Sequence, residues 1–111
     1  MKKYGKKDAN QDSIVDGLRW CGASVTSLAS VGGGVPDLLI GYRGKNFIAE
    51  VKMPHGTLTE DQIEWHGSWR GKVFIWRTVA DAILTVCGPK ILDAYGKYLA
   101  KKGARDDRKD D

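Results

Sequence analysis

The first periodic segment of the chain places its apolar residues at helical spacing: Ile14, Val15 and Leu18. Either Asp8 or Asn10 can serve as the N-cap of this helix, because both side chains accept hydrogen bonds from backbone amides. Gly22 is a stop signal beyond its last turn. The pattern therefore predicts a helix over Asn10–Trp20.

Three segments of extended character come next: Ser24–Ser30, Pro36–Tyr42 and Asn46–Met53. The first two are separated by Gly32–Gly34, a break in the chain that lacks the pattern of a phosphate-binding loop. Glycines at this point would let the backbone approach DNA or a metal site closely. Because only the turn-like residues Arg43–Asn46 separate the second and third strands, we expect these two strands to form a hairpin.

Helical and extended patterns alternate in the second half of the chain. Thr59 is a potential N-cap followed by the acidic residues Glu60 and Asp61, and the helix that it begins is expected to end near Gly71. Beyond that helix the sequence predicts one strand and two helices: Lys72–Thr78, Ala80–Cys87 and Pro89–Lys102. The predicted fold class is α/β, with a small mixed sheet flanked by helices.

The composition is that of one globular domain. The 111 residues are 41% hydrophobic and 29% charged, which disfavours global disorder. We expect a basic arm over residues 1–7, a single domain over residues 8–100 and a charged, disordered tail over residues 101–111. The four lysines of the arm together carry as much positive charge as the net charge of the whole chain, which is +4. Because the tail is also slightly basic, the domain between them is slightly acidic.

The remaining compositional features concern the compartment of the protein. No apolar run approaches the roughly 20 residues that a membrane-spanning helix requires, and no apolar stretch follows the basic N-terminus as in a secretory signal. Cys21 and Cys87 are too few for a disulfide scaffold and fit a reducing compartment. These features predict a cytoplasmic protein without a membrane partner. The basic arm is either a contact for phosphates or a solvated chain end.

The residues with the clearest chemical potential lie at the ends of the two hairpin strands. Asp37 follows Pro36 at the start of one strand, and Glu50 and Lys52 end the next. Side chains alternate along a strand, so Glu50 and Lys52 share a face, about 6.6 Å apart along the backbone. Pairing of the strands would bring Asp37 beside Glu50. The alternative is an ordinary strand with alternating charges.

Two converging carboxylates are costly unless a cation lies between them. Carboxylate oxygens are hard ligands, which suit Mg²⁺ or Mn²⁺. Such a metal can bind a phosphate oxygen and lower the pKa of a bound water. Lys52 would then orient the water or stabilise charge that develops in the transition state. These residue types predict metal-assisted hydrolysis of a phosphodiester.

Two of these segments, Gly33–Gly41 and Phe47–Lys52, resemble the PD-(D/E)xK nuclease superfamily, most closely its VRR-NUC branch. Three further segments are similar to the second helix and last core strand of that branch: Leu58–Gln62, Trp65–His66 and Gly71–Val73. The resemblance covers roughly residues 8–84 and implies a restriction-endonuclease-like αβββαβ core. Small standalone members, many of them from phages, resemble dimeric nucleases that cut branched DNA such as Holliday junctions, and this resemblance implies a homodimer.

The resemblance also assigns roles to single residues. It implies that Asp37 and Glu50 are ligands of Mg²⁺ or Mn²⁺, that Lys52 is the catalytic lysine, and that the carbonyl of Val51 is a further metal ligand. Gln62 would reach the site from the first turn of its helix and hold a phosphate or a water; otherwise it faces solvent.

One departure concerns the first helix, where members of the superfamily often carry a glutamate that faces the metal. This chain has none there. Asn10 is the first substitute as a metal ligand, and Asp8 and Asp12 are the alternatives; Asn10 can also be a helix cap only. His66 follows Gln62 by four residues and so shares its helical face. It is either a further site residue or a residue that only packs against its neighbours.

Other side chains have weaker claims. His55, in the loop after Lys52, lies near a phosphate or in solvent. Four tryptophans can stack on bases: Trp20, Trp65, Trp69 and Trp76. Trp65 and Trp69, one helical turn apart, can instead belong to the core or to a dimer surface.

The sequence thus predicts a metal-dependent, structure-selective DNA endonuclease of the bacterial or phage-infected host cytosol, acting as a homodimer on branched DNA. A less selective duplex or nicking endonuclease uses the same residues and is the first alternative. The second is a non-catalytic DNA-binding accessory protein, which the missing helix-one glutamate motivates.

Overall fold

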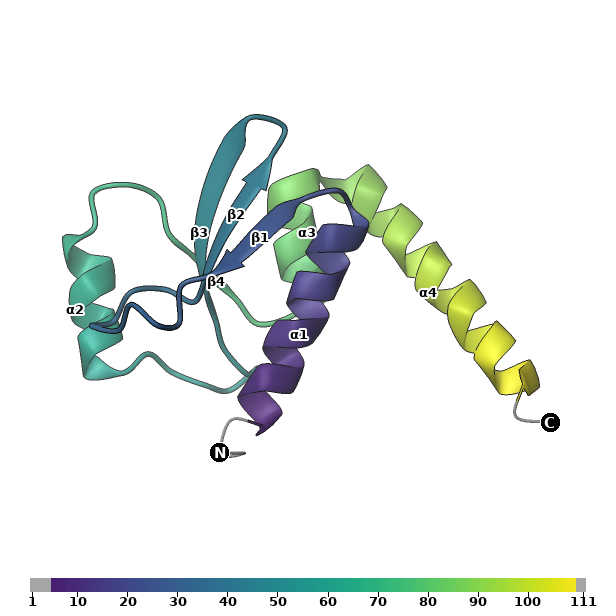
Figure 1. The fold of residues 1–111 in the computed structure, drawn as a ribbon, viewed down its shortest axis with the longest axis horizontal. Helices are drawn as coiled ribbons and strands as arrows, with labels where there is room; N and C mark the ends of the chain where they lie inside the picture. The colour runs from purple at the N-terminus through teal and green to yellow at the C-terminus, as the bar shows by residue number, and fades with distance from the viewer. Residues whose placement is uncertain (1–4, 110–111) are drawn as a thin grey trace.

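The computed structural model describes the backbone of residues 5–109 and the side chains of residues 9–105. Its helices and strands follow one another as α1 (Gly5–Trp20), β1 (Ser24–Ser27), β2 (Leu38–Tyr42), β3 (Lys45–Val51), α2 (Glu60–Ser68), β4 (Phe74–Trp76), α3 (Val79–Cys87) and α4 (Pro89–Lys109). Figure 1 shows the sheet between α2 on one side and α1 and α3 on the other.

The four strands form one mixed sheet in the order β1-β2-β3-β4. The first three strands are antiparallel, and β4 runs parallel to β3 after the crossover through α2. The prediction of an α/β fold with a mixed sheet flanked by helices is therefore confirmed. The predicted hairpin is confirmed as well: Tyr42 pairs with Lys45, and Arg43 and Gly44 between them have φ values of 50° and 80°. Two such residues give a turn whose twist matches the strands.

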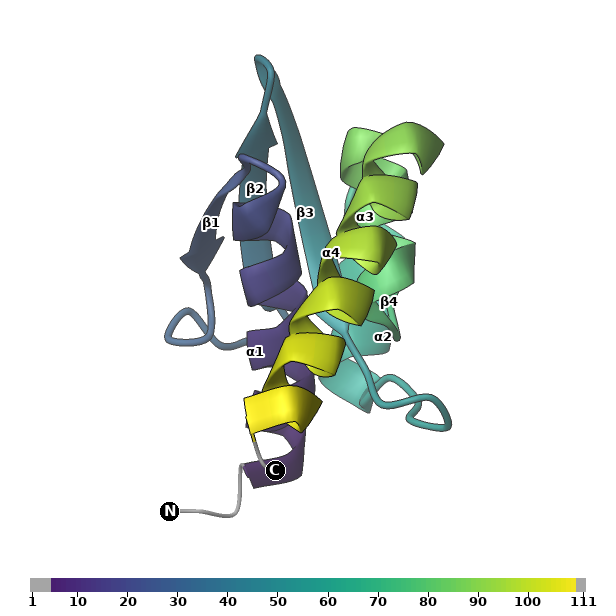
Figure 2. The same cartoon turned by 90° about the vertical axis from the view of Figure 1, so that its right-hand side faces the viewer.

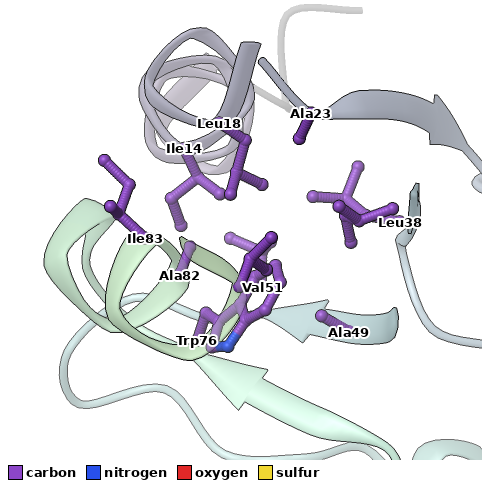
Figure 3. Packing of buried hydrophobic residues seen from close by; sticks show 11 residues of the cluster. Ile14, Leu18, Ala23, Leu38, Ala49, Val51, Trp76, Ala82 and Ile83 are labelled. Atoms are coloured by element: carbon purple, nitrogen blue, oxygen red, sulfur yellow. The ribbon is translucent and has the colours of Figure 1, made fainter. Parts of the chain in front are cut away.

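The hydrophobic core lies between one face of the sheet and the helices α1 and α3. Alternate strand residues point to this face, and apolar side chains of the two helices pack against them (Figure 3). Its largest fully buried apolar side chains are Trp76, Ile14, Leu18, Leu38, Ile40, Ile83 and Val51. Gly17 allows α1 to approach α3, because a Cβ at this position would lie 2.6 Å from Cγ1 of Val79. The core fixes β3, whose end carries the candidate site.

The chain ends differ from the predicted arm and tail. α1 begins at Gly5, so part of the predicted basic arm is helical and Asn10 lies inside the helix instead of capping it; residues 1–4 lie outside the described residues. α4 continues to Lys109, where we expected disorder from residue 101, and residues 110–111 are not described. The tail is rich in good helix formers, and adding a turn to a helix already formed by packing is far easier than nucleating one.

The other bounds differ by a few residues. β1 ends at Ser27 and not Ser30, β4 is shorter than predicted, and α2 ends at Ser68, before Gly71.

Figure 2 shows α1, α3 and α4 together on one side of the sheet. Among the described residues, no helix combines the length and the apolar character that crossing a membrane would require.

Candidate active site

Two acidic side chains are buried where β2 begins and β3 ends. Asp37, directly before β2, is 8% exposed, and Glu50, near the end of β3, is 0% exposed. The register pairs Leu38 with Ala49, so continuing it by one residue places Asp37 opposite Glu50. Directly opposed residues of an antiparallel pair have Cβ atoms about 4.5–5.5 Å apart. Among the described side chains these are the two buried charged residues, and the structure places them together.

The carboxylate of Asp37 is fixed by the backbone of β3. Its Oδ2 accepts a hydrogen bond from the N–H of Val51 at 2.8 Å. Because the N–H and C=O of a strand residue point to the same side, the Val51 carbonyl also faces the start of β2. The residue opposite Val51 in the continued register is Pro36, which has no N–H to donate to that carbonyl. This geometry suits the Val51 carbonyl to the ligand role that the family resemblance implies.

Gln62 joins α2 to Glu50. Its Nε2 donates to Oε2 of Glu50 at 3.0 Å, while its Oε1 accepts from the N–H of Thr59 at 2.9 Å. Oγ1 of Thr59 in turn accepts from the N–H of Gln62 at 3.2 Å, which completes a capping box at the start of α2. The structure therefore brings Gln62 into the site, and its two amide atoms fix both the helix start and the glutamate.

Lys52 supplies a positive charge at the same place. Its Nζ lies 3.9 Å from Oε2 of Glu50, and its side chain is 11% exposed. The backbone of Lys52 is held on both sides: its N–H donates to the carbonyl of Trp76 at 3.0 Å, and its carbonyl accepts from Nδ2 of Asn10 at 3.0 Å. These two hydrogen bonds fix the main chain of Lys52, so its side chain starts from a defined position beside Glu50.

Asn10 approaches the site from α1. Its amide nitrogen is committed to the Lys52 carbonyl, which ties the helix to the end of β3 across 42 residues of chain. The amide oxygen keeps acceptor capacity for a ligand role. Of the two alternatives, Asp12 is exposed, and the side chain of Asp8 lies outside the described residues.

His66, which the sequence left open as a site residue or a packing residue, lies close to Lys52. Its Nε2 is buried and has no hydrogen-bond partner among the described residues. Burial lowers the pKa of the His66 imidazole, and the nearby positive charge of Lys52 lowers the pKa further. Both causes favour the neutral form of the imidazole. The spacing of four residues from Gln62 was the available signal in the sequence.

The glycine run acts on α2. A Cβ at Gly34, which has φ +83°, would overlap the carbonyl of Asp61 in the first turn of that helix. The glycine therefore lets the loop pack directly on the start of α2, next to Gln62. The close approach predicted for this run is made to a helix of the same chain. Gly32 and Gly33 also have positive φ values, but a Cβ at either position would meet no described atom within 4 Å.

The other sequence candidates lie in different surroundings. His55 is exposed in a loop. Trp76 is part of the core, and Trp20 packs on Tyr95 and Tyr98 with ring centroids 5.1 Å apart in each case. Trp65 stacks on Trp69 at 4.7 Å and meets the ring of His66 edge-on at 5.8 Å. Trp65 therefore helps to place His66.

The donor set at this site consists of hard oxygen atoms. Among the described side chains no three His, Cys, Asp or Glu residues form a group that could hold a metal ion, so a cation here would use two carboxylates with carbonyl or amide oxygens. Such oxygens suit Mg²⁺ or Mn²⁺. The Lys52 ammonium balances one of the two buried negative charges, and a divalent cation would offset the other and leave one positive charge for an anionic ligand. The residues present fit such an ion.

Comparison with known protein families, with curated proteins and with solved structures finds no match to this chain.

Proposed function

We propose that this protein is a metal-dependent DNA endonuclease that hydrolyses phosphodiester bonds, with branched DNA such as Holliday junctions as its preferred substrate. The observation that carries the proposal is the burial of Asp37 and Glu50 side by side, with Nζ of Lys52 3.9 Å from Glu50. Buried carboxylates are costly unless they are paired, hydrogen-bonded or bound to a cation, and perturbed acidic groups of this kind cluster at functional sites. The sequence resemblance to the VRR-NUC branch supports the choice of DNA and of branched structures, and we place the chain there as part of the proposal.

The residues of the chain take distinct roles in this reaction. Asp37, Glu50 and the Val51 carbonyl would hold Mg²⁺ or Mn²⁺, which supplies a water of lowered pKa and neutralises phosphate charge. Gln62 keeps the Glu50 carboxylate oriented through its 3.0 Å hydrogen bond. Lys52, whose ammonium lies 3.9 Å from Glu50, would stabilise negative charge that develops on the phosphate oxygens and so lower the barrier. Asn10 fixes the main chain that carries Lys52.

Cleavage of a labelled four-way junction, with Mg²⁺ or Mn²⁺ titrated in, tests the proposal. Asp37→Ala, Glu50→Ala and Lys52→Ala should each reduce cleavage by roughly two orders of magnitude or more while the far-UV spectrum is kept. Glu64→Ala is the matched control, because Glu64 is exposed on α2 and loses the same charge. Cleavage by the wild type in excess chelator would contradict the metal role.

Linear duplex and nicked duplex in the same assay separate a structure-selective enzyme from a less selective one. The accessory-protein alternative is favoured by one observation: no third acidic side chain joins the pair among the described residues. Tight binding of the junction without cleavage in Mg²⁺, Mn²⁺ or Co²⁺ would support that alternative.

A homodimer is part of the proposal, because two sites related by a two-fold axis suit paired incisions on a symmetric junction. Sedimentation equilibrium with and without junction DNA measures the oligomeric state directly, and a monomer that cleaves both strands would overturn this part.

A further inference from the structure

A hollow in the molecule lies at the far end of β3 from the candidate active site. It has a volume of about 450 Å³, within the size range of ligand-binding pockets. Its lining combines the start of β3, the start of β4 and the last turn of α3: Lys45, Asn46, Phe47, Lys72, Phe74, Thr85 and Val86. Phe47 is the lining residue of β3 nearest to Glu50, three strand residues away, which corresponds to about 10 Å, and strand alternation places the two side chains on opposite faces of the sheet. The hollow is therefore separate from the carboxylate pair.

The apolar part of this hollow is an aromatic surface. The rings of Phe47 and Phe74 lie 6.0 Å apart at an interplanar angle of 47°, and both residues are half-buried. Phe74 in turn stacks on the buried Trp76 at 6.2 Å, so its ring is held by the core. A flat apolar group can pack against such preset rings with little loss of side-chain freedom.

The rim of the hollow is positively charged. Lys45 and Lys72 are exposed, and neither forms an ion pair with a described acidic side chain. The lining contains no acidic residue, and Asn46 and Thr85 add neutral hydrogen-bonding groups. Two ammonium groups beside an aromatic floor match a ligand that joins a flat ring to a phosphate.

We propose that this hollow binds a nucleotide of a DNA single strand, with its base on Phe47 and Phe74 and its phosphates at Lys45 and Lys72. The inference rests on the proposed function for the identity of the nucleic acid, and it adds a substrate feature to it: an unpaired strand in contact with the enzyme. Stacking on aromatic rings beside basic side chains is the general mode of binding single strands.

The test measures fluorescence anisotropy of a labelled thymidine ten-mer at several salt concentrations, in chelator so that no cleavage takes place. The variant is K45Q/K72Q, and K90Q/K97Q on the exposed face of α4 is the control with the same charge loss. We expect about tenfold weaker binding by K45Q/K72Q and a salt slope smaller by about 1.4, because two phosphate contacts are lost. Binding and salt slope equal to the wild type would overturn the inference.

A second comparison isolates the base. An abasic ten-mer of equal charge should bind the wild type about tenfold more weakly than the thymidine ten-mer, and F47L should bind the two oligonucleotides equally while keeping the thermal stability of a folded protein. Equal binding of both ten-mers by the wild type would reduce the hollow to an anion site and overturn the nucleotide assignment. Because these experiments need no cleavage, single-strand binding by a wild type that cuts no DNA would support the hollow and overturn the endonuclease proposal alone.

Discussion

Gln62 and Glu50 are joined by a 3.0 Å hydrogen bond from Nε2 to Oε2, while the other amide atom of Gln62 caps its own helix at Thr59. The same side chain therefore defines where α2 begins and how a buried carboxylate is oriented. A glutamine serves both purposes, because an amide presents a donor and an acceptor at the same time.

Replacement of Gln62 separates these two contributions. Gln62→Ala removes both and should cost about 1–2 kcal/mol of unfolding free energy, in the range of a lost cap and a lost hydrogen bond. Gln62→Glu keeps the acceptor for Thr59 but sets a second carboxylate against Glu50, so it should be less stable than Gln62→Ala at pH 8 in chelator. Urea unfolding measures both values, and a Gln62→Glu protein as stable as the wild type would contradict the contact.

Alanine substitutions at Gly34 and at Gly33 test together whether the glycine run packs on α2. Both have positive φ, so an alanine at either position costs about 1 kcal/mol of backbone strain. Only at Gly34 does the added Cβ also meet the Asp61 carbonyl. Gly34→Ala should therefore lose at least about 2 kcal/mol and reduce junction cleavage, whereas Gly33→Ala should lose about half of that stability. Equal losses for the two variants would show that the loop does not hold α2.

His66 gives the molecule a defined pH dependence. Since burial and then Lys52 lower its pKa in the folded state below the unfolded value of 6.5, the unfolded state binds more protons in the window below pH 6.5. The contribution of His66 to stability is therefore complete above pH 6.5 and is lost as the pH falls from there toward the folded pKa. His66→Gln should be less sensitive over this window. Urea unfolding at pH 7.5 and 5.5 measures the difference, and an equal loss in both proteins would exclude His66 as its source.

The two cysteines should react slowly in the folded protein. Burial first, and then the neighbouring Cys87 thiol, raise the pKa of Cys21 to about 11, and burial raises the pKa of Cys87. The thiolate is the reactive form, so little of it is present near pH 8. Mass spectrometry after timed exposure to iodoacetamide should show slow alkylation of native protein and rapid alkylation in urea. Because burial is the larger cause, Cys87→Ala should accelerate alkylation of Cys21 only modestly; rapid native labelling of Cys21 would contradict its burial.

The pairing of Asp37 with Glu50 was accessible from sequence because strand alternation and a two-residue turn determine which residues face one another. The same logic identified the mixed α/β sheet and the hairpin. The contact between Asn10 and the Lys52 carbonyl was not accessible, since it depends on how α1 packs on the sheet and not on any local period. Likewise, the sequence around Gly34 indicates only a break in the chain, because the role of this glycine depends on the packing of α2 against it. The aromatic hollow could not be predicted from the sequence, because its residues come from three separate elements.

The central claim is that Asp37 and Glu50 together hold one divalent cation. Titration of Mn²⁺ into the folded protein, with free Mn²⁺ followed by electron paramagnetic resonance, tests it without any assumption about substrate. We expect one site in the wild type and in Glu64→Gln, and its loss in both Asp37→Asn and Glu50→Gln, with far-UV spectra that show both variants to be folded. Binding of Mn²⁺ by Glu50→Gln with wild-type affinity would contradict the account.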